Sequence, residues 1–534
     1  MTDLPLVPAP SSVTPTDGPG YVLGPRTRVV AGTHPEVASA VAHRLSRLAG
    51  FAVPVTANGA DEPDTIVLRL ADDAAALGLP DAGLTPERAA GAYRVEVTER
   101  RVTLSALAVD GLLHAATVLE QLAVRDAGAA PDTASAPGAL AAAPAPDAGP
   151  VPAATPAPDA APTPDAAPTP VRLPAVVVVD TPRFGWRGLS VDVARHFFGP
   201  EVLRTVVDVM ASLRLNVLHL HLTDDQGWRL DVPSRPQLVD VASKTAVGDD
   251  PGGYYTVDDL AELTAYARGR GITVVPEIDL PGHVNAALHA LGELTPSGEP
   301  ADPYTGIEVG FSRLHADLPT TEPFLRDVLT DVASMTPGPY VHIGGDEVHT
   351  MEADEFARLV TTAARIVEEA GKTVVGWQEV ARATLTPGTV VQLWDERDGA
   401  ELVRPAVEAG ALLLLSPASK VYLDLKYDAH TPIGLEWAGH VELRDSYDWD
   451  PLAVVPGVPE SSVVGIEAAL WTETIRTPDD LFFLLLPRLA AVAEVAWSQP
   501  DRRSWEDFGR RVRHLARSWD RAGLPWYRSP QIPW

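Results

Sequence analysis

The sequence predicts an α/β protein in which a (β/α)₈ barrel follows a small α+β domain. Eight short apolar runs alternate with amphipathic helical patterns from residue 183 to residue 534. This alternation is typical of parallel strands joined by right-handed crossovers. The segment is long enough for a barrel with enlarged loops, since such barrels range from about 200 to over 400 residues. Before residue 183 the alternation is absent, and all 12 Trp residues lie after position 185.

The small domain is expected over residues 1–182. Its predicted elements are strands at 27–31 and 65–70, a hairpin at 92–106, and helices at 35–48 and 110–124. The hairpin prediction depends on apolar and polar residues that alternate along "AYRVEVTERRVTLSA". The run "AVVVVDTP", residues 175–182, is expected to return the chain to the same sheet.

An Ala/Pro-rich insert interrupts this domain at about residues 127–171. Ala and Pro occupy 27 of the 40 positions from 131 to 170 (15 Ala and 12 Pro), and these positions hold no aromatic residue, Lys or Arg. Such a composition buries too little apolar surface to offset the entropy lost on ordering. The sequence therefore predicts a disordered or polyproline-like segment here.

The barrel is expected over residues 183–534. The eight apolar runs predict strands at 188–193, 216–222, 273–279, 341–346, 373–378, 389–394, 411–416 and 464–470. In barrels of this kind the functional groups lie at the carboxyl ends of the strands. The residues that follow each run are therefore the candidates for function.

Composition excludes several classes of protein. The net charge of −30 argues against nucleic acid and anionic membrane as partners. The absence of Cys excludes disulfides, thiolate metal sites and a Cys nucleophile. No signal peptide or membrane-spanning run is recognisable, so a cytoplasmic enzyme is the default expectation, with secretion by another route left open.

Carboxylates, one Arg and several Trp follow the predicted strands. In chain order these residues are Asp192, Arg195, Asp224, Asp225, Trp228, Glu277, Asp279, His283, Asp346, Glu347, Trp377, Trp394, Tyr422, Asp424, Trp471 and Glu473. Carboxylates and Arg bind hydroxyl groups, and Trp faces pack against the C–H surfaces of sugars. A carbohydrate is therefore the expected substrate.

The stretch "VHIGGDEVHT", residues 341–350, places two carboxylates side by side. Adjacent side chains on a strand point to opposite faces. Asp346 and Glu347 therefore cannot easily flank one bond as an acid and a nucleophile. Either one of them is structural, or the two perform different tasks.

Several of these motifs resemble the family-20 glycoside hydrolases, the β-N-acetylhexosaminidases. The motifs are "RHF", "LHLHLTDDQGWR", "PEIDLPGH", "HIGGDE", "GW" at 376–377, "YLDLKY" and "LWTE", and they occur in this order from about residue 172 to the C-terminus. The resemblance implies an exo-acting, retaining enzyme without a cofactor or metal. It acts on terminal β-linked N-acetylhexosamine, and the 2-acetamido group of the substrate is the nucleophile.

The resemblance also implies a role for each candidate. Glu347 would protonate the leaving oxygen, Asp346 would hold the acetamido N–H, and Tyr422 would hydrogen-bond the acetamido oxygen. The substrate-binding residues would be Arg195, Trp377, Trp394, Asp424, Trp437, Trp471 and Glu473, with Asp224 and His283 behind the catalytic pair. Gly344 and Gly345 would remove side-chain bulk beside the sugar.

The acid role requires Glu347 to hold a proton near neutral pH. Burial and the neighbouring Asp346 predict a raised pKa for the Glu347 carboxyl. Two alternatives stay open: a metal-dependent barrel hydrolase built around His219 and His221, and a sugar-binding protein without catalysis. A structural role is the preferred interpretation of both histidines, since they precede the end of their strand. The sequence leaves the choice between GlcNAc and GalNAc and the oligomeric state open.

Overall fold

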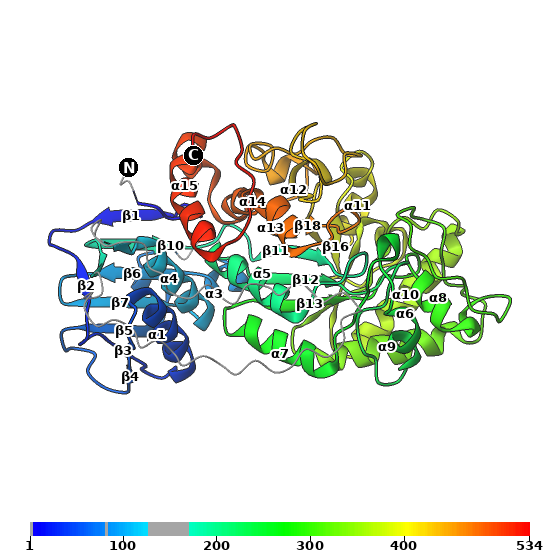
Figure 1. Ribbon diagram of the computed structural model, residues 1–534, viewed down its shortest axis with the longest axis horizontal. Helices are drawn as coiled ribbons and strands as arrows, with labels where there is room; N and C mark the ends of the chain where they lie inside the picture. The colour runs from blue at the N-terminus through cyan, green and yellow to red at the C-terminus, as the bar shows by residue number, and fades with distance from the viewer. Residues whose placement is uncertain (1–3, 81–83, 126–169) are drawn as a thin grey trace, which may run out of the picture.

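The computed structural model describes residues 4–80, 84–125 and 170–534. Most of the predicted insert at about 127–171 lies outside the described residues. Figure 1 shows a small sheet-containing unit at one end of the molecule and a barrel with its surrounding helices at the other. The C-terminal helix α15 (Trp505–Ala522) lies near the junction of the two units.

The small unit contains a seven-stranded mixed sheet in the order β1-β10-β6-β7-β5-β3-β4. Its strands are β1 (Ser12–Pro15), β3 (Arg28–Val30), β4 (Val55–Thr56), β5 (Thr65–Leu70), β6 (Tyr93–Val97), β7 (Arg101–Ala106) and β10 (Val176–Asp180). A second sheet contains β2 (Tyr21–Leu23), β8 (Val124–Arg125) and β9 (Val171–Leu173), and the helices are α1 (Pro35–Ala49), α2 (Ala74–Leu77), α3 (Pro86–Ala90) and α4 (Val109–Leu122). The predicted strands, helices and hairpin are all present, and the elements that the sequence did not predict are short.

The hairpin shows why alternation was informative. Tyr93, Val95 and Val97 of β6 are buried, while the residues between them are partly exposed. The run at 175–182 forms β10, which pairs with both β1 and β6. Its Val176 and Val178 point into the same core. The chain thus returns to this sheet on the far side of the insert, as predicted.

The second unit is a closed barrel of eight parallel strands. They are β11 (Trp186–Asp192), β12 (Val217–His221), β13 (Thr273–Glu277), β14 (Tyr340–His342), β15 (Thr373–Trp377), β16 (Val390–Leu393), β17 (Leu412–Leu415) and β18 (Val463–Leu470). Each overlaps one of the eight predicted runs, so the predicted fold class is confirmed.

Helices surround the barrel and extend its loops. They are α5 (Pro200–Ser212), α6 (Gln237–Ala242), α7 (Val257–Arg268), α8 (Asn285–Ala290), α9 (Thr321–Met335), α10 (Ala353–Glu369), α11 (Gly399–Glu408), α12 (Ala418–Val421), α13 (Pro478–Leu485) and α14 (Arg488–Trp497). Helices α6 and α8, from the loops after β12 and β13, lie toward the end of the molecule away from the small unit (Figure 1). No helix among the described residues is both long and apolar enough to cross a membrane.

A buried polar cluster joins the two units. Asp180, the last residue of β10, forms an ion pair with Arg214 at 3.0 Å. The same carboxylate accepts hydrogen bonds from Tyr93 at 2.7 Å and from the indole of Trp497 at 2.9 Å. The ionic side chains have no exposed surface. These contacts link the sheet of the small unit to the loop after α5 and to α14.

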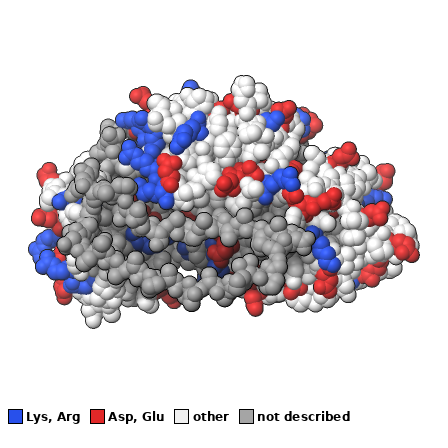
Figure 2. Space-filling view, viewed as in Figure 1, with Lys and Arg blue, Asp and Glu red and all other residues white. Residues whose placement is uncertain are grey.

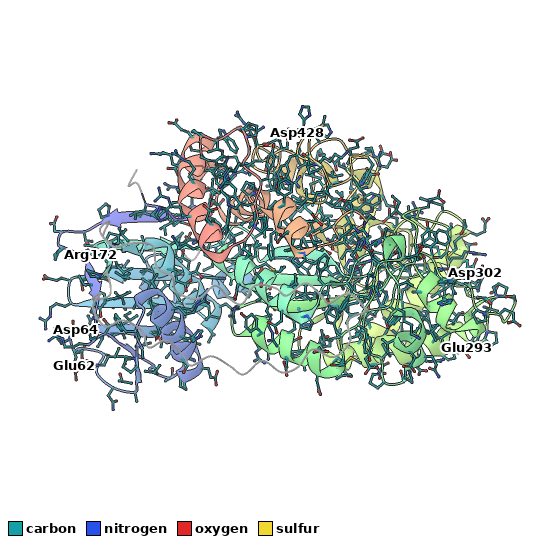
Figure 3. The ribbon with its side chains drawn as sticks, in the orientation of Figure 1. Glu62, Asp64, Arg172, Glu293, Asp302 and Asp428 are labelled. Carbon is teal, nitrogen blue, oxygen red and sulfur yellow. The ribbon has the colours of Figure 1, made fainter. Side chains whose placement is uncertain are left out.

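Acidic side chains are found on the outer surface of both units. Glu62 and Asp64 lie at the outer edge of the small unit, and Glu293 and Asp302 lie at the opposite end (Figure 3). Because acidic residues outnumber basic ones by 72 to 42, a local cluster of basic side chains is the exception on this chain.

Candidate active site

The acidic pair lies in a loop after β14. The sequence predicted a strand as far as residue 346, but β14 ends at His342. Gly344, Gly345 and Glu347 have positive φ angles of 68°, 115° and 51°, which are incompatible with an extended strand. The pair is therefore carried by an irregular loop. The strand-face argument for separating the two carboxylates does not apply to this geometry.

One histidine contacts both carboxylates. His283 lies in the loop after β13, and its Nε2 is 3.7 Å from Asp346 Oδ2 and 3.6 Å from Glu347 Oε2. Its other ring nitrogen, Nδ1, is 3.2 Å from Asp224 Oδ1. Like Glu347, His283 has a positive φ, 53°. Both side chains are thus held by unusual backbone conformations, which are frequent at functional sites.

Asp224 fixes the charge of this histidine. Arg195 Nη2 lies 2.8 Å from Asp224 Oδ2, and His221 Nε2 lies at the same distance. Burial opposes ionisation, but Arg195 and His283 hold the pKa of Asp224 well below its usual range. Burial likewise opposes a charged His283, but Asp224 and Asp346 raise its pKa well above the usual value. His283 is therefore an imidazolium that faces both carboxylates of the pair.

The pKa prediction for Glu347 was wrong, and the shift falls on its neighbour. Burial raises the pKa of Asp346 to about 6, with the charge of Glu347 adding to the effect. Glu347 is also subject to burial, but its contact with the His283 cation outweighs this and lowers its pKa. The difference follows from position, since the Glu347 side chain is 27% exposed and that of Asp346 only 12%.

A row of aromatic rings lies beside the acidic pair. Successive ring centroids are 5.9 Å apart for Trp394 and Trp437, 6.0 Å for Trp437 and Tyr422, 6.2 Å for Tyr422 and Trp471, and 5.7 Å for Trp471 and Trp377. Trp437 is 46% exposed, whereas Trp377 has no exposed surface. The Trp377 indole donates a hydrogen bond to Glu277 at 2.8 Å, and its predicted contact with the sugar stays a prediction.

Three charged groups complete the site. The Arg195 guanidinium lies 5.0 Å from the ring centre of Trp471, in the aromatic row of the site. It also forms an ion pair with Asp192 at 3.6 Å, at the end of β11. Burial and the charge of Glu473 raise the pKa of Asp424 well above its usual value. Both Asp424 oxygens are buried and have no hydrogen-bond partner among the residues that the structure describes. Burial also raises the pKa of Glu473.

The two glycines act through packing. A Cβ on Gly344 would lie 1.7 Å from Oδ1 of Asp279, and a Cβ on Gly345 would lie 2.7 Å from Val380 Cγ1. The Gly345 N–H donates to the same Asp279 oxygen. Both glycines are therefore required for close approach to these two neighbours, and the clearance they would give the sugar stays a prediction. Both glycines also need positive φ.

His219 and His221 lie in a buried polar network inside the barrel. His219 Nδ1 is 2.9 Å from Glu467 and its Nε2 is 3.1 Å from Glu277, while His221 bonds to Glu277 and Asp224. These contacts agree with the structural role predicted for both histidines. His219, Glu277 and His342 also offer ligand atoms close enough to hold a metal ion.

Glu379 is a site residue that the sequence did not single out. It is 8% exposed, and its Oε2 accepts a hydrogen bond from the Trp394 indole at 3.2 Å. Burial raises its pKa to about 8, and the charge of Asp346 adds to the effect. Its position two residues after Trp377, in "GWQEV", was the only available signal.

Two family models match this chain. The model of the glycosyl hydrolase family 20 catalytic domain matches residues 184–500, and the model of domain 2 of the same family matches residues 3–141. A β-N-acetylhexosaminidase from Cellulomonas fimi is 50% identical over 540 residues, which cover all of this chain and 98% of that protein.

Solved structures agree with this match. The family-20 β-N-acetylhexosaminidase from Streptomyces coelicolor A3(2) has a TM-score of 0.85 at 37% identity, covering 100% of this chain and 99% of the other. A mutant Streptomyces plicatus β-hexosaminidase in complex with its product GlcNAc has the same TM-score and identity, covering 100% and 98%. With the eight-stranded barrel, the small unit and the acidic pair in place, these matches show that the chain is a glycoside hydrolase and belongs to glycosyl hydrolase family 20.

Proposed function

We propose that the chain is an exo-acting, retaining β-N-acetylhexosaminidase in which the 2-acetamido group of the substrate is the nucleophile. The observation that carries this proposal is the shared contact of Asp346 and Glu347 with His283. Two carboxylates on one imidazole do not flank a glycosidic bond from opposite faces, as an acid and a protein nucleophile must. A nucleophile supplied by the substrate removes this requirement.

Each member of the pair then has its own task. Asp346, held as a carboxylate, accepts the acetamido N–H and stabilises the positive charge that develops as the acetamido oxygen attacks C1. Tyr422 is buried beside it and donates its hydroxyl to the acetamido oxygen. Glu347 protonates the leaving oxygen and later removes a proton from water. General acid catalysis of this kind contributes about 10²–10⁴-fold.

Substrate binding explains how Glu347 functions as an acid despite its lowered pKa. In the free site the His283 imidazolium contacts both carboxylates of the pair and favours the charged form of Glu347. A bound sugar would cover the exposed part of the Glu347 side chain and exclude water. That desolvation favours the neutral carboxyl.

The rest of the site suits a sugar. The row from Trp394 to Trp471 offers aromatic faces for the acetamido methyl and the pyranose, and a ring face near a cationic transition state contributes on the order of 0.5–2 kcal/mol. Arg195, Asp424 and Glu473 supply groups for the sugar hydroxyls. The two Asp424 oxygens, buried and unpartnered among the described residues, can form hydrogen bonds with sugar hydroxyls.

The relatives support the same assignment. The Cellulomonas fimi relative is a β-N-acetylhexosaminidase, and the Streptomyces plicatus relative holds GlcNAc as its product. A terminal β-linked GlcNAc is thus the first substrate to test, with GalNAc, its O4 epimer, as the second.

The test compares nitrophenyl N-acetyl-β-glucosaminide with the matching β-glucoside, each with and without a chelator. We expect rapid, chelator-insensitive turnover of the acetamido substrate and little turnover of the glucoside. Equal turnover of both would contradict substrate assistance. Loss of activity with chelator and recovery with added metal would favour a metal hydrolase built on the His219 cluster. Binding of GlcNAc without turnover would favour a sugar-binding protein.

A further inference from the structure

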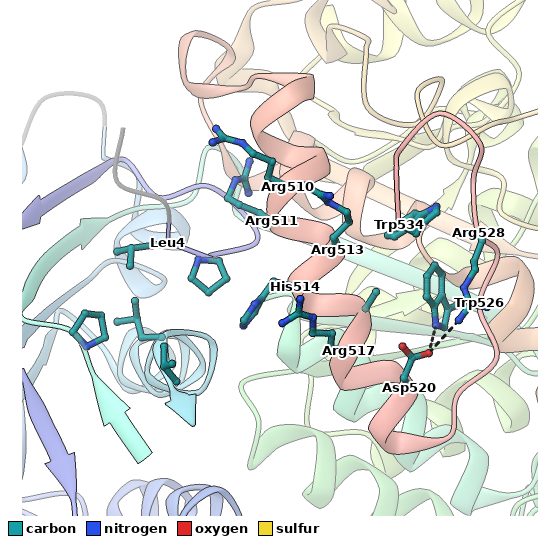
Figure 4. Close-up of a pocket in the computed structure, with 15 residues that line it drawn as sticks. Leu4, Arg510, Arg511, Arg513, His514, Arg517, Asp520, Trp526, Arg528 and Trp534 are labelled. Carbon is teal, nitrogen blue, oxygen red and sulfur yellow. Dashed lines mark hydrogen bonds and ion pairs between the residues drawn. The ribbon is translucent and has the colours of Figure 1, made fainter. Parts of the chain in front are cut away.

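A groove of about 970 Å³ lies between α15 and the small unit, away from the acidic pair (Figure 4). Arg513 and Arg517 line it from α15, and Arg528 lines it from the C-terminal segment. Figure 2 shows Lys and Arg side chains gathered over this region. On a chain with net charge −30, such a concentration of guanidinium groups indicates a site for an anionic partner.

The basic groups of the groove have spare hydrogen-bonding capacity. Arg517 is exposed and has no ion pair or hydrogen bond to another described residue. Arg513 donates to the carbonyl of Pro533 at 3.0 Å and has no described ion pair. Arg528 lies 3.7 Å from Asp520, on the exposed surface. Exposed pairs of this kind are worth about 0–1 kcal/mol, so they are easily exchanged for another acid.

Two tryptophans add an aromatic surface to the groove. Trp526 and Trp534 both line it, and their ring centres lie 4.7 Å apart. Trp534 is 37% exposed. Aromatic-lined grooves bind Pro-rich chains because such chains lose little entropy when they are fixed in a polyproline conformation. The groove therefore suits a partner that is both acidic and rich in Pro.

This chain contains a segment with those two properties. Residues 126–169 hold five Asp, Asp126, Asp132, Asp147, Asp159 and Asp165, with 11 Pro and no Lys or Arg. The described chain also reaches the groove on both sides of this segment. Val124 of β8 and Pro174, just after β9, both line the groove, and Arg125 is paired with Val171 across the two strands.

We propose that this groove is the docking site of the chain's own acidic Ala/Pro-rich segment, residues 126–169. Its Asp side chains would pair with Arg513, Arg517 and Arg528, and its Pro residues would pack on Trp526 and Trp534. Attachment at both ends makes the binding intramolecular, with an effective concentration of about millimolar. A weak intrinsic affinity is therefore sufficient.

The first test measures this affinity in trans. Because Arg125 and Val171 are paired, residues 126–169 can be replaced by a short Gly/Ser turn in the full chain. A fluorescent peptide of residues 126–169 should bind this deleted protein with a Kd of about 1 mM or below. The double variant R513E/R517E should weaken binding at least about fivefold, as should added salt. R404E, an exposed arginine on α11, is the control and should leave the Kd unchanged.

The second test uses the intact chain and elastase, which cleaves after small residues such as the Ala of this segment. R513E/R517E should speed cleavage within 126–169 several-fold at low salt, while R404E should not. The wild type, R513E/R517E and R404E should have the same melting temperature and glycosidase activity, since none of these arginines lies at the active site. That result would separate lost docking from lost folding.

Three outcomes would overturn the proposal. The first is a peptide Kd above about 10 mM, or one that the groove variants do not change. The second is binding of inorganic polyphosphate to the groove without binding of the peptide, which would assign the site to an external anion. The third is a change in molecular mass for R513E/R517E without a change in cleavage, which would assign the groove to a second copy of the chain.

Discussion

At the scale of single residues, different degrees of burial shift the pKa values of two carboxyl groups that share one cation in opposite directions. His283 contacts both Asp346 and Glu347, yet the pKa is raised to about 6 in the more buried residue and lowered in the more exposed one. The difference in burial thus distinguishes Asp346, proposed to stabilise charge, from Glu347, proposed to transfer the proton.

Activity should fall as the pH drops through about 6. Asp346 has a raised pKa, so it is a carboxylate above this pH and a neutral acid below it. The neutral form cannot stabilise the charge on the acetamido nitrogen. The measurement is the pH dependence of kcat/KM on the nitrophenyl substrate, with Asp346→Asn for comparison. Activity that stays constant to about pH 4.5, or an acid limb that persists in the variant, would contradict this role.

Glu347→Gln should lose about 10²–10⁴-fold in kcat on substrates with poor leaving groups, because these depend on protonation. On a nitrophenyl substrate the rate of the first step, in which the leaving group departs, should fall less, because nitrophenolate leaves without protonation. The comparison needs a chitobiose-type disaccharide and the aryl glycoside, with the melting temperature as the folding control. Glu293→Gln, on the distant surface, is the matched control. Equal losses on both substrates would argue against the acid role.

Glu379 is predicted to position Trp394 as a neutral acid. Its pKa of about 8 keeps it protonated below that pH and ionised above it, next to Asp346. Glu379→Gln, a neutral isostere, should keep activity within about threefold at about pH 6–7 and should lose the decline expected above about pH 8. Glu379→Ala should raise KM through movement of Trp394. If activity declines above about pH 8 equally in the wild type and in Glu379→Gln, the decline does not come from ionisation of Glu379 and this role is wrong.

At the scale of elements, the irregular loop after β14 determines where the acidic pair points. The strand ends early because Gly344 must approach Asp279 with φ at +68°. Glycines with positive φ are common on this chain, but few of them are so tightly packed. The consequence of adding one methyl group therefore differs from glycine to glycine.

Gly344→Ala should abolish most activity, because its Cβ would lie 1.7 Å from Asp279 and displace the loop that carries both carboxylates. Gly371→Ala is the matched control, since Gly371 has φ +77° and a Cβ added there would meet no atom of the described residues within 4 Å. It should cost about 1–2 kcal/mol of backbone strain and leave kcat unchanged. Activity assays and urea unfolding separate the two effects. Comparable activity in both variants would show that the Asp279 contact is dispensable.

At the scale of the whole molecule, a buried ionic cluster joins the small unit to the barrel. The buried Asp180 carboxylate accepts hydrogen bonds from Tyr93 and Trp497 and forms an ion pair with Arg214. A buried charge that loses its partner is costly, whereas an exposed pair contributes little. The interface between the units is therefore sensitive to a single truncation.

Arg214→Ala should lower the free energy of unfolding by about 3–5 kcal/mol, because Asp180 would remain buried without its cation. Arg358→Ala removes the exposed pair with Asp317 and should cost below about 1 kcal/mol. Urea unfolding followed by Trp fluorescence measures both variants. Equal losses would mean that burial does not set the strength of the Asp180 pair.

The sequence by itself determined the fold class, the order of the eight strands and the identity of the acidic pair. Period-two alternation and repeated apolar runs are local properties, and the candidate residues follow those runs directly. Short elements such as β4 and β8 were missed because two residues carry no periodicity. The Gly-Gly motif was recognised, but its packing against Asp279 depends on a loop that follows a different strand, β13.

Only the tertiary structure decided the electrostatics and the partners of the site. The pKa of Glu347 depends on His283 from another loop, and the role of Glu379 depends on the indole of Trp394. The basic groove likewise combines α15 with residues 4–5 and with the segments around β8 and β9. Burial and charge act through space over a few ångströms, so they become defined only when distant segments are packed together.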